Sequence, residues 1–286
     1  MSYKSILVHA SQGQSGAGRY RLAAAIAVAE NATLAAIATS GLTEFIYRYA
    51  AATALAPLAA DDLDFLAVAA RDDLAAFLDA TRGLGLSGIS TRINDGSAAA
   101  ALPLEGRYCD LLVIGQSQPG DTLIADAHAT ARTLVAHAPC PVLVVPPGGP
   151  AGAPATALPA MAPSRVLLAW DGSMEASRAV RAALPLLRRA ASVGAVTFNP
   201  SHHALGDGAP GAALADYLSH HGVALELIDG GDSADVGRSL LALAAARSSE
   251  LIVMGSYSHS RLLEIVLGGA TRTVLAETDV PVLMAH

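Results

Sequence analysis

The stretch RVLLAWDGSMEASRAVRAALPLLRRA, residues 165–190, decides the fold of its part of the chain. Its apolar run, Arg165–Trp170, predicts a buried strand, and after Asp-Gly-Ser an apolar stripe with helical spacing begins near Met174. Downstream we expect strands at Ala195–Phe198, Ala224–Ile228, Leu251–Met254 and Pro281–Met284, and helices at Ala212–His221, Ala234–Ala246 and Thr271–Glu277. This alternation, with strands apolar on both faces, predicts a parallel sheet covered by helices and joined by right-handed crossovers.

The same order occurs earlier in the chain, which indicates an internal repeat. ILVHAS (Ile6–Ser11) resembles VLLAWDGS (Val166–Ser173) at an offset of 160 residues. DLLVIG matches ELIVMG, and CPVLVVP matches VPVLMAH, both at an offset of 140, so the first half is 20 residues longer in its middle. The extra length falls around Phe45–Gly85, where Pro57 is expected to divide a short helix from a long one.

The repeat predicts an α/β fold made of two tandem doubly wound domains, each a five-stranded parallel sheet, related by a pseudo-two-fold axis. We expect the domains at residues 1–147 and 165–286. The segment 148–164 is rich in Pro, Gly and Ala and is expected to be a linker. Strands of the first domain are expected at Ser5–His9, Thr33–Ala38, Gly88–Ile93, Leu111–Ile114 and Val142–Val145.

Composition narrows the classes of function. Of the 286 residues, 52% are hydrophobic and 15% charged, which provides for a large core. A net charge of −7 argues against sequence-independent nucleic-acid binding. The sequence has no uncharged apolar run of about 18 residues and no signal-peptide pattern, so we expect a cytoplasmic protein without a membrane span. Cys109 and Cys140 lack CxxC or metal-ligand spacing and are expected to be reduced core thiols.

Three features of the second half suggest a ligand site. In open parallel sheets, ligands bind beyond the carboxyl ends of the strands. Asp171 follows the first strand of this half, Gly255 follows the fourth, and Gly268 and Gly269 precede the last helix. Glycines let the backbone approach a ligand, and the helix start at Ala270–Thr271 offers N–H groups to a phosphate. The alternative is that the glycines only shape turns while Asp171 caps a helix.

Together, WDGS, MGSYSHSRLLEIVLGG, the following TRTVL and the terminal VPVLM resemble the universal stress protein family in its tandem two-domain form, with an adenine nucleotide alpha hydrolase-like fold. The ATP-binding branch carries G-x2-G-x9-G-[ST]. Here Ser258 replaces the second glycine and Gly269 stands where Ser or Thr is expected, with Thr271 as a substitute hydroxyl. The resemblance implies that Ala169 and Val196 flank an adenine base and that ATP brings Mg²⁺. The implied nucleotide site comprises Ala169, Asp171, Val196, Met254, Gly255, Ser256, Ser258, Gly268, Gly269, Ala270 and Thr271.

The first half keeps little of this motif. Only Gly115 is retained, while Ser11 stands at the position of Asp171, and Gln118, His128 and Ala129 replace Ser258, Gly268 and Gly269. The loop GQSGAGR (Gly13–Arg19) lacks the lysine of a P-loop. We expect this half to be structural.

Two function classes stay open. The first is a nucleotide-sensing stress protein, in which ATP biases conformation or association with slow or absent turnover, because no catalytic base is visible. The second is an interaction protein that stabilises an unidentified protein partner without a ligand. An adenylating enzyme or electron-transfer flavoprotein is disfavoured, since WDGSMEAS does not supply their serine-glycine loop. No catalytic or metal-ligating residue is expected, because the adjacent histidines 202–203 and 220–221 point apart.

Assembly is expected within the chain. The tandem form resembles a dimer of single-domain relatives that pair through their last strands, so Val142–Val145 and Val282–Met284 are expected to meet as an intrachain pseudo-dimer. Further homodimer formation stays open.

Overall fold

The computed structural model describes residues 2–11, 16–53, 61–116, 127–147, 163–200, 211–256 and 269–286. The first half contains β1 (Ser5–Ala10), α1 (Ala17–Glu30), β2 (Thr33–Thr39), α2 (Leu42–Thr53), α3 (Asp61–Thr81), β3 (Ile89–Asn94), α4 (Ala98–Glu105), η2 (Gly106–Tyr108), β4 (Leu111–Gly115), α5 (Ala127–His137) and β5 (Val142–Val145). The second contains β6 (Arg165–Ala169), α6 (Met174–Leu187), β7 (Ser192–Thr197), α7 (Ala212–His220), β8 (Leu225–Asp229), α8 (Val236–Ala246), β9 (Leu251–Gly255), α10 (Ala270–Glu277) and β10 (Val282–Ala285).

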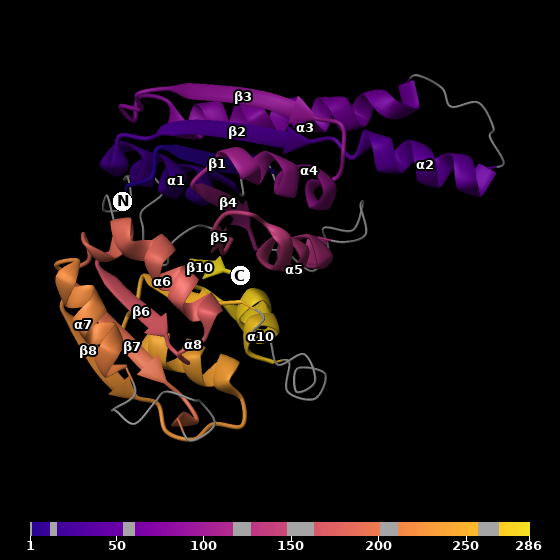
Figure 1. Cartoon of the computed structure of the whole chain (residues 1–286). Coiled ribbons are helices and arrows are strands. Elements are labelled where there is room, and N and C mark those ends of the chain that lie inside the picture. Colours follow the sequence, from indigo (N-terminus) through magenta and orange to yellow (C-terminus); the bar gives the residue numbers. More distant parts are fainter. Residues whose placement is uncertain are drawn as a thin grey trace.

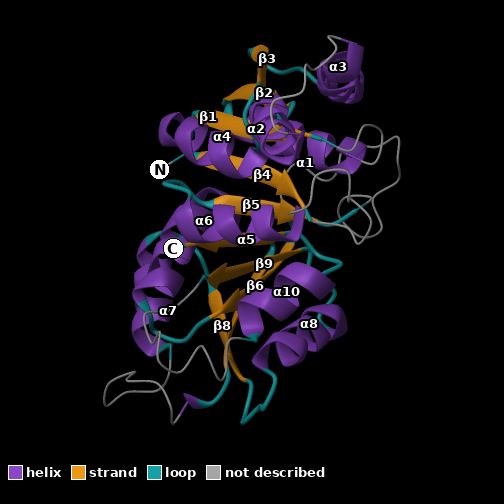
Figure 2. Ribbon diagram, turned by 90° about the vertical axis from the view of Figure 1, so that its right-hand side faces the viewer, coloured by secondary structure: helices purple, strands orange, loops and turns teal. Residues whose placement is uncertain are grey.

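The strands form one ten-stranded sheet in the order β3-β2-β1-β4-β5-β10-β9-β6-β7-β8 (Figures 1 and 2). Neighbouring strands are parallel within each half, and only the central pair, β5 and β10, is antiparallel. Each half therefore has the same doubly wound strand order, as the repeat predicts. The two-domain α/β fold is confirmed.

Two layers of helices cover the sheet. Buried residues of α1, α3, α6 and α7 form one core with one face of the strands. Buried residues of α4, α5, α8 and α10 form a second core on the opposite face. Ala169 packs in the second core, and Trp170, the next residue, packs against the first. Successive side chains at the end of β6 thus serve opposite faces of the sheet.

The halves meet along β5 and β10. Leu283 pairs with Leu143, Val282 with Val144, and Met284 with Val142, in antiparallel register. The predicted meeting of the two terminal runs is therefore confirmed. On one side of this junction, Arg189 at the end of α6 forms an ion pair of 2.8 Å with the nearly buried Glu30 at the end of α1.

Some elements differ from the prediction. Strand β7 begins at Ser192 rather than Ala195 and includes Gly194, where a Cβ would lie 2.8 Å from the Ile228 side chain. The edge strands β3 and β8 are largely exposed rather than apolar on both faces. The insertion forms α2 and α3, and α2 projects from the body of the protein (Figure 1). Pro57 lies outside the described residues.

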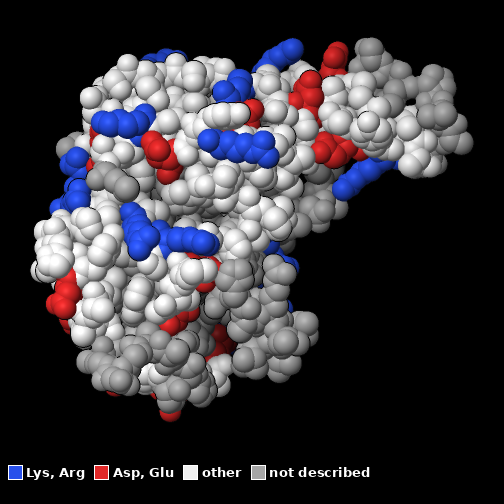
Figure 3. Space-filling view, viewed as in Figure 1, with Lys and Arg blue, Asp and Glu red and all other residues white. Residues whose placement is uncertain are grey.

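The described surface gives no sign of a membrane or polyanion site. In the described ranges, no helix combines the length and apolar character needed to cross a bilayer. On the face in Figure 3, acidic and basic side chains are interspersed rather than gathered into one basic field.

Candidate functional site

The carboxyl ends of three strands bring predicted site residues together. In the sheet register, Ala169 of β6 lies between Val196 of β7 and Met254 of β9. Val196 is 1% exposed and Met254 6%, whereas Ala169 is partly exposed. These residues form an apolar floor on the α8 and α10 side of the sheet.

Asp171 and Ser173 shape the turn after β6. The Asp171 Oδ1 atom accepts a hydrogen bond of 2.9 Å from the Ser173 backbone N–H. The Ser173 hydroxyl then accepts one of 3.1 Å from the Ala176 N–H and caps α6. Gly172 between them has φ +74, which an L-residue adopts only with strain. Asp171 orders the turn, while Ser173 caps the helix.

Gly255 is required by helix packing. A Cβ atom at this position would lie 2.5 Å from the Ala176 backbone nitrogen and 2.7 Å from the Glu175 carbonyl carbon. The first turn of α6 therefore sits directly on the end of β9. The glycine that the sequence presents as part of a phosphate loop has this structural role in the described chain.

Ser256 belongs to the junction between the halves. Its side chain is fully buried, and its hydroxyl lies 3.1 Å from both the Val135 and the Ala285 carbonyl oxygens. In the opposite direction, the Gln116 side-chain amide donates a hydrogen bond of 3.2 Å to the Leu275 carbonyl oxygen. Ser256 thus holds the second half against α5 of the first, a role that sequence reasoning missed.

The start of α10 is the most open part of the candidate site. Its N-cap residue, Gly269, has no side chain to accept a hydrogen bond from the first turn. Ala270 and Thr271 are partly exposed. Gly237 of α8 packs against this turn, since a Cβ there would lie 3.1 Å from Ala270 Cα. Ser258 and Gly268 lie outside the described residues.

A second connection at this edge was not predicted. Asn199, at the end of β7, exchanges hydrogen bonds with the Ser233 backbone, at 3.0 Å from its amide nitrogen and 2.7 Å to its amide oxygen. Asp235 caps α8 by accepting a 3.0 Å hydrogen bond from the Arg238 N–H. Glu277 of α10 raises the pKa of Arg238 by hydrogen bonding and charge. The Asn-x33-Ser pairing leaves no local pattern in the sequence.

These residues fit an adenine nucleotide at two points. An uncapped helix start suits a phosphate group, and the Asp171 carboxylate has a second oxygen, Oδ2, for a ribose or base contact. In the portion of the chain that the structure describes, no three His, Cys, Asp or Glu side chains gather as metal ligands. A Mg²⁺ ion would therefore depend mainly on phosphate oxygens and water.

The first half fills the corresponding edge with its own side chains. Arg19, which is buried, donates hydrogen bonds of 2.7 Å and 3.1 Å to the Ser11 carbonyl and hydroxyl oxygens. The Tyr20 hydroxyl also donates to the Ser11 carbonyl at 2.9 Å. Burial and the charge of Arg19 lower the pKa of the neighbouring His9 to about 3. Gln118 lies outside the described residues.

Comparison with known proteins agrees with the fold. Residues 163–286 match the model of the universal stress protein family. A universal stress protein from Archaeoglobus fulgidus DSM 4304 is similar over 100% of this chain and 96% of its own, at 14% identity and a TM-score of 0.70. A functionally unknown protein from Pseudomonas aeruginosa PAO1 is similar over 99% of this chain and 92% of its own, at 18% identity and a TM-score of 0.57. No curated protein matches the chain in sequence.

Proposed function

Because residues 163–286 belong to the universal stress protein family, we propose that the second half binds an adenine nucleotide, ATP, at the carboxyl ends of β6, β7 and β9. The bound nucleotide biases the conformation or association of a cytoplasmic stress-response protein. The observation that carries the proposal is the adjacency of Ala169, Val196 and Met254 beneath the turn at Asp171.

The parts of the site have separate tasks in this proposal. The apolar floor meets the base, Asp171 accepts a hydrogen bond from the adenosine, and the N–H groups of Ala270 and Thr271 bind a phosphate oxygen. Bound ATP with Mg²⁺ supplies negative charge that orders the start of α10. The proposal includes no catalytic residue, so turnover is slow or absent.

The test is thermal stabilisation by ATP and Mg²⁺, compared between the native chain and Gly269→Asp. A ligand at one hundred times its dissociation constant stabilises a protein by about 2.7 kcal/mol. We expect Gly269→Asp to abolish this gain, because a carboxylate at the helix start repels phosphate while favouring the helix dipole. Ala212→Asp is the matched control, since it adds the same charge at the exposed start of α7.

A second function is favoured by a different observation. Gly255 is accounted for by contact with Ala176, and the Ser256 hydroxyl by contact with Val135. Both positions can thus be explained without a ligand, as in a protein that acts by binding a partner. If millimolar ATP changes neither melting temperature nor hydrodynamic radius in the native chain, this second function replaces the first.

A further inference from the structure

A pocket lies between α6 and α7, on the face of the sheet opposite the nucleotide candidate. Its volume is about 210 Å³, and it is lined by Trp170, Ser177, Val180, Arg181, Ala213, Leu214 and Tyr217. Trp170 and Tyr217 pack at the edge of the core that contains α6 and α7, whereas Ala169 and Val196 belong to the other core. The two sites are therefore separated by the sheet.

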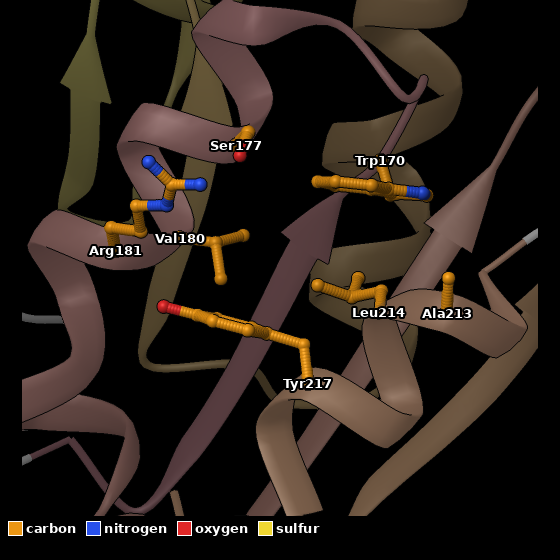
Figure 4. Close-up of a pocket in the computed structure, with 7 residues that line it drawn as sticks. All are labelled: Trp170, Ser177, Val180, Arg181, Ala213, Leu214 and Tyr217. Carbon is orange, nitrogen blue, oxygen red and sulfur yellow. The ribbon is translucent and has the colours of Figure 1, made fainter. Parts of the chain in front are cut away.

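Two aromatic side chains form opposite walls of this pocket. In Figure 4, the Trp170 indole and the Tyr217 ring lie on opposite sides, both nearly edge-on to the viewer, with Val180 and Leu214 between them. The Trp170 wall is anchored because its backbone N–H donates a 2.9 Å hydrogen bond to the Val196 carbonyl. The Tyr217 wall is backed by the His221 ring, at a centroid distance of 4.7 Å. Such walls suit a flat, apolar ring.

The polar side of the pocket carries positive charge. Arg181 and Ser177 lie together on one side, which is also the side of the Tyr217 hydroxyl (Figure 4). Arg181 is exposed, and no carboxylate of the described residues lies within ion-pair distance of its guanidinium. A guanidinium pairs most strongly with a carboxylate, through parallel hydrogen bonds.

The first half closes the corresponding space. Between α1 and α3, Tyr20 is fully buried and meets Phe77 edge-on, with ring centroids 5.5 Å apart. Its hydroxyl lies 3.1 Å from the Ser11 backbone nitrogen, at the end of β1. In the second half, small or branched side chains, Ser177 and Val180, line α6 at this level and leave the space open. The pocket is thus a difference between two otherwise similar halves.

We propose that the pocket between α6 and α7 binds a small planar aromatic carboxylate, with the ring between Trp170 and Tyr217 and the carboxylate on Arg181. The volume is below the roughly 300–1,000 Å³ of pockets for drug-sized ligands, so the ligand has one ring or two fused rings. This site is independent of the proposed nucleotide site.

Trp170 provides a direct readout because it is the only tryptophan in the sequence. The probes are benzoate, its uncharged analogue benzamide, and the non-planar cyclohexanecarboxylate. We expect benzoate to change Trp170 fluorescence saturably, with at least tenfold weaker binding of the other two, since tenfold corresponds to about 1.4 kcal/mol. No saturable change with benzoate, or equal binding of benzamide or cyclohexanecarboxylate, would overturn the proposal.

Two pairs of variants localise the binding. Arg181→Gln should weaken benzoate about tenfold or more while leaving benzamide unchanged, whereas Arg178→Gln, on the exposed side of the same helix, should change neither. Ala213→Phe should block the pocket from an exposed position, and Ala212→Phe is its control one residue away. Unaltered benzoate affinity in Arg181→Gln or Ala213→Phe contradicts the proposal. Gly269→Asp should leave benzoate binding intact, which separates this result from the nucleotide test.

Discussion

Leu143 and Leu283 face each other at the centre of the antiparallel β5–β10 pair, and they occupy equivalent positions, 140 residues apart, in the two halves. The pseudo-two-fold axis passes between them. Two hydrogen bonds repeat the relationship, since Gln116 donates to the Leu275 carbonyl and Ser256 to the Val135 carbonyl. Equivalent residues of the two halves therefore make reciprocal contacts, as in a symmetric dimer.

Truncating the junction should destabilise both halves. Leu283 has no exposed surface, so Leu283→Ala is expected to lower the free energy of unfolding by about 2–5 kcal/mol. Urea unfolding followed by circular dichroism measures the loss. Leu104→Ala, at a side chain that is 55% exposed, is the control and should change stability by less than about 0.5 kcal/mol. Equal stability of the two variants would show that the junction contributes little.

Gly255 should be intolerant of a side chain even without nucleotide. Gly255→Ala forces a methyl group against the Ala176 nitrogen and is expected to cost about 1–3 kcal/mol through displacement of α6. Gly88→Ala is matched because its new methyl group would meet only Thr33 Cγ2, at 3.7 Å. Thermal unfolding of both variants without ligand provides the measurement. A melting temperature for Gly255→Ala equal to that of Gly88→Ala would rule out the packing role.

Acid should weaken the first half through His9. Its pKa is about 3 in the folded protein and near 6.5 when unfolded, so the unfolded chain binds more protons between these values. The stabilisation is present above pH 6.5 and is lost as pH falls toward 3, by roughly 1.4 kcal/mol per pH unit. In urea unfolding between pH 6.5 and 5, His9→Gln should lose a slope of about that size. His137→Gln, at an exposed histidine, should retain it.

The two cysteines should couple under oxidation, although their spacing in the sequence gives no hint of it. Their sulfur atoms lie 3.7 Å apart, and the Cys109 thiol donates to Cys140, which lowers the pKa of Cys140. Diamide, by accepting two hydrogen atoms, should convert both thiols into one disulfide. Mass spectrometry after alkylation should find two blocked thiols, and the melting temperature should rise, since closing a loop of this length contributes roughly 3–4 kcal/mol. Two freely alkylated thiols after diamide would contradict this expectation.

The fold could be predicted because its signals are local and repeated. The run at residues 165–169 and the stripe of α6 each bury one stretch of sequence, and the offset of 140 relates β5 to β10. Boundaries failed where a glycine stands inside a strand, as at Gly194 in β7, because its small size serves contact with Ile228 rather than a turn.

The candidate site was less predictable than the fold. Strand order places Ala169, Val196 and Met254 side by side, which follows from topology. The buried role of Ser256 depends on α5, 121 residues earlier in the chain, and no spacing within one half reveals it. The Trp170 pocket similarly depends on which residues of α7 lie opposite α6.

The covalent tie between the halves also removes a restriction. In a dimer of identical subunits, any substitution at the axis is made twice and must suit both sides at once. Here the glutamine at 116 and the serine at 256 solve the same contact differently, and Arg189 of one half meets Glu30 of the other without a mirrored pair. A single polypeptide can therefore specialise its two lobes separately while keeping the assembly that symmetry first provides.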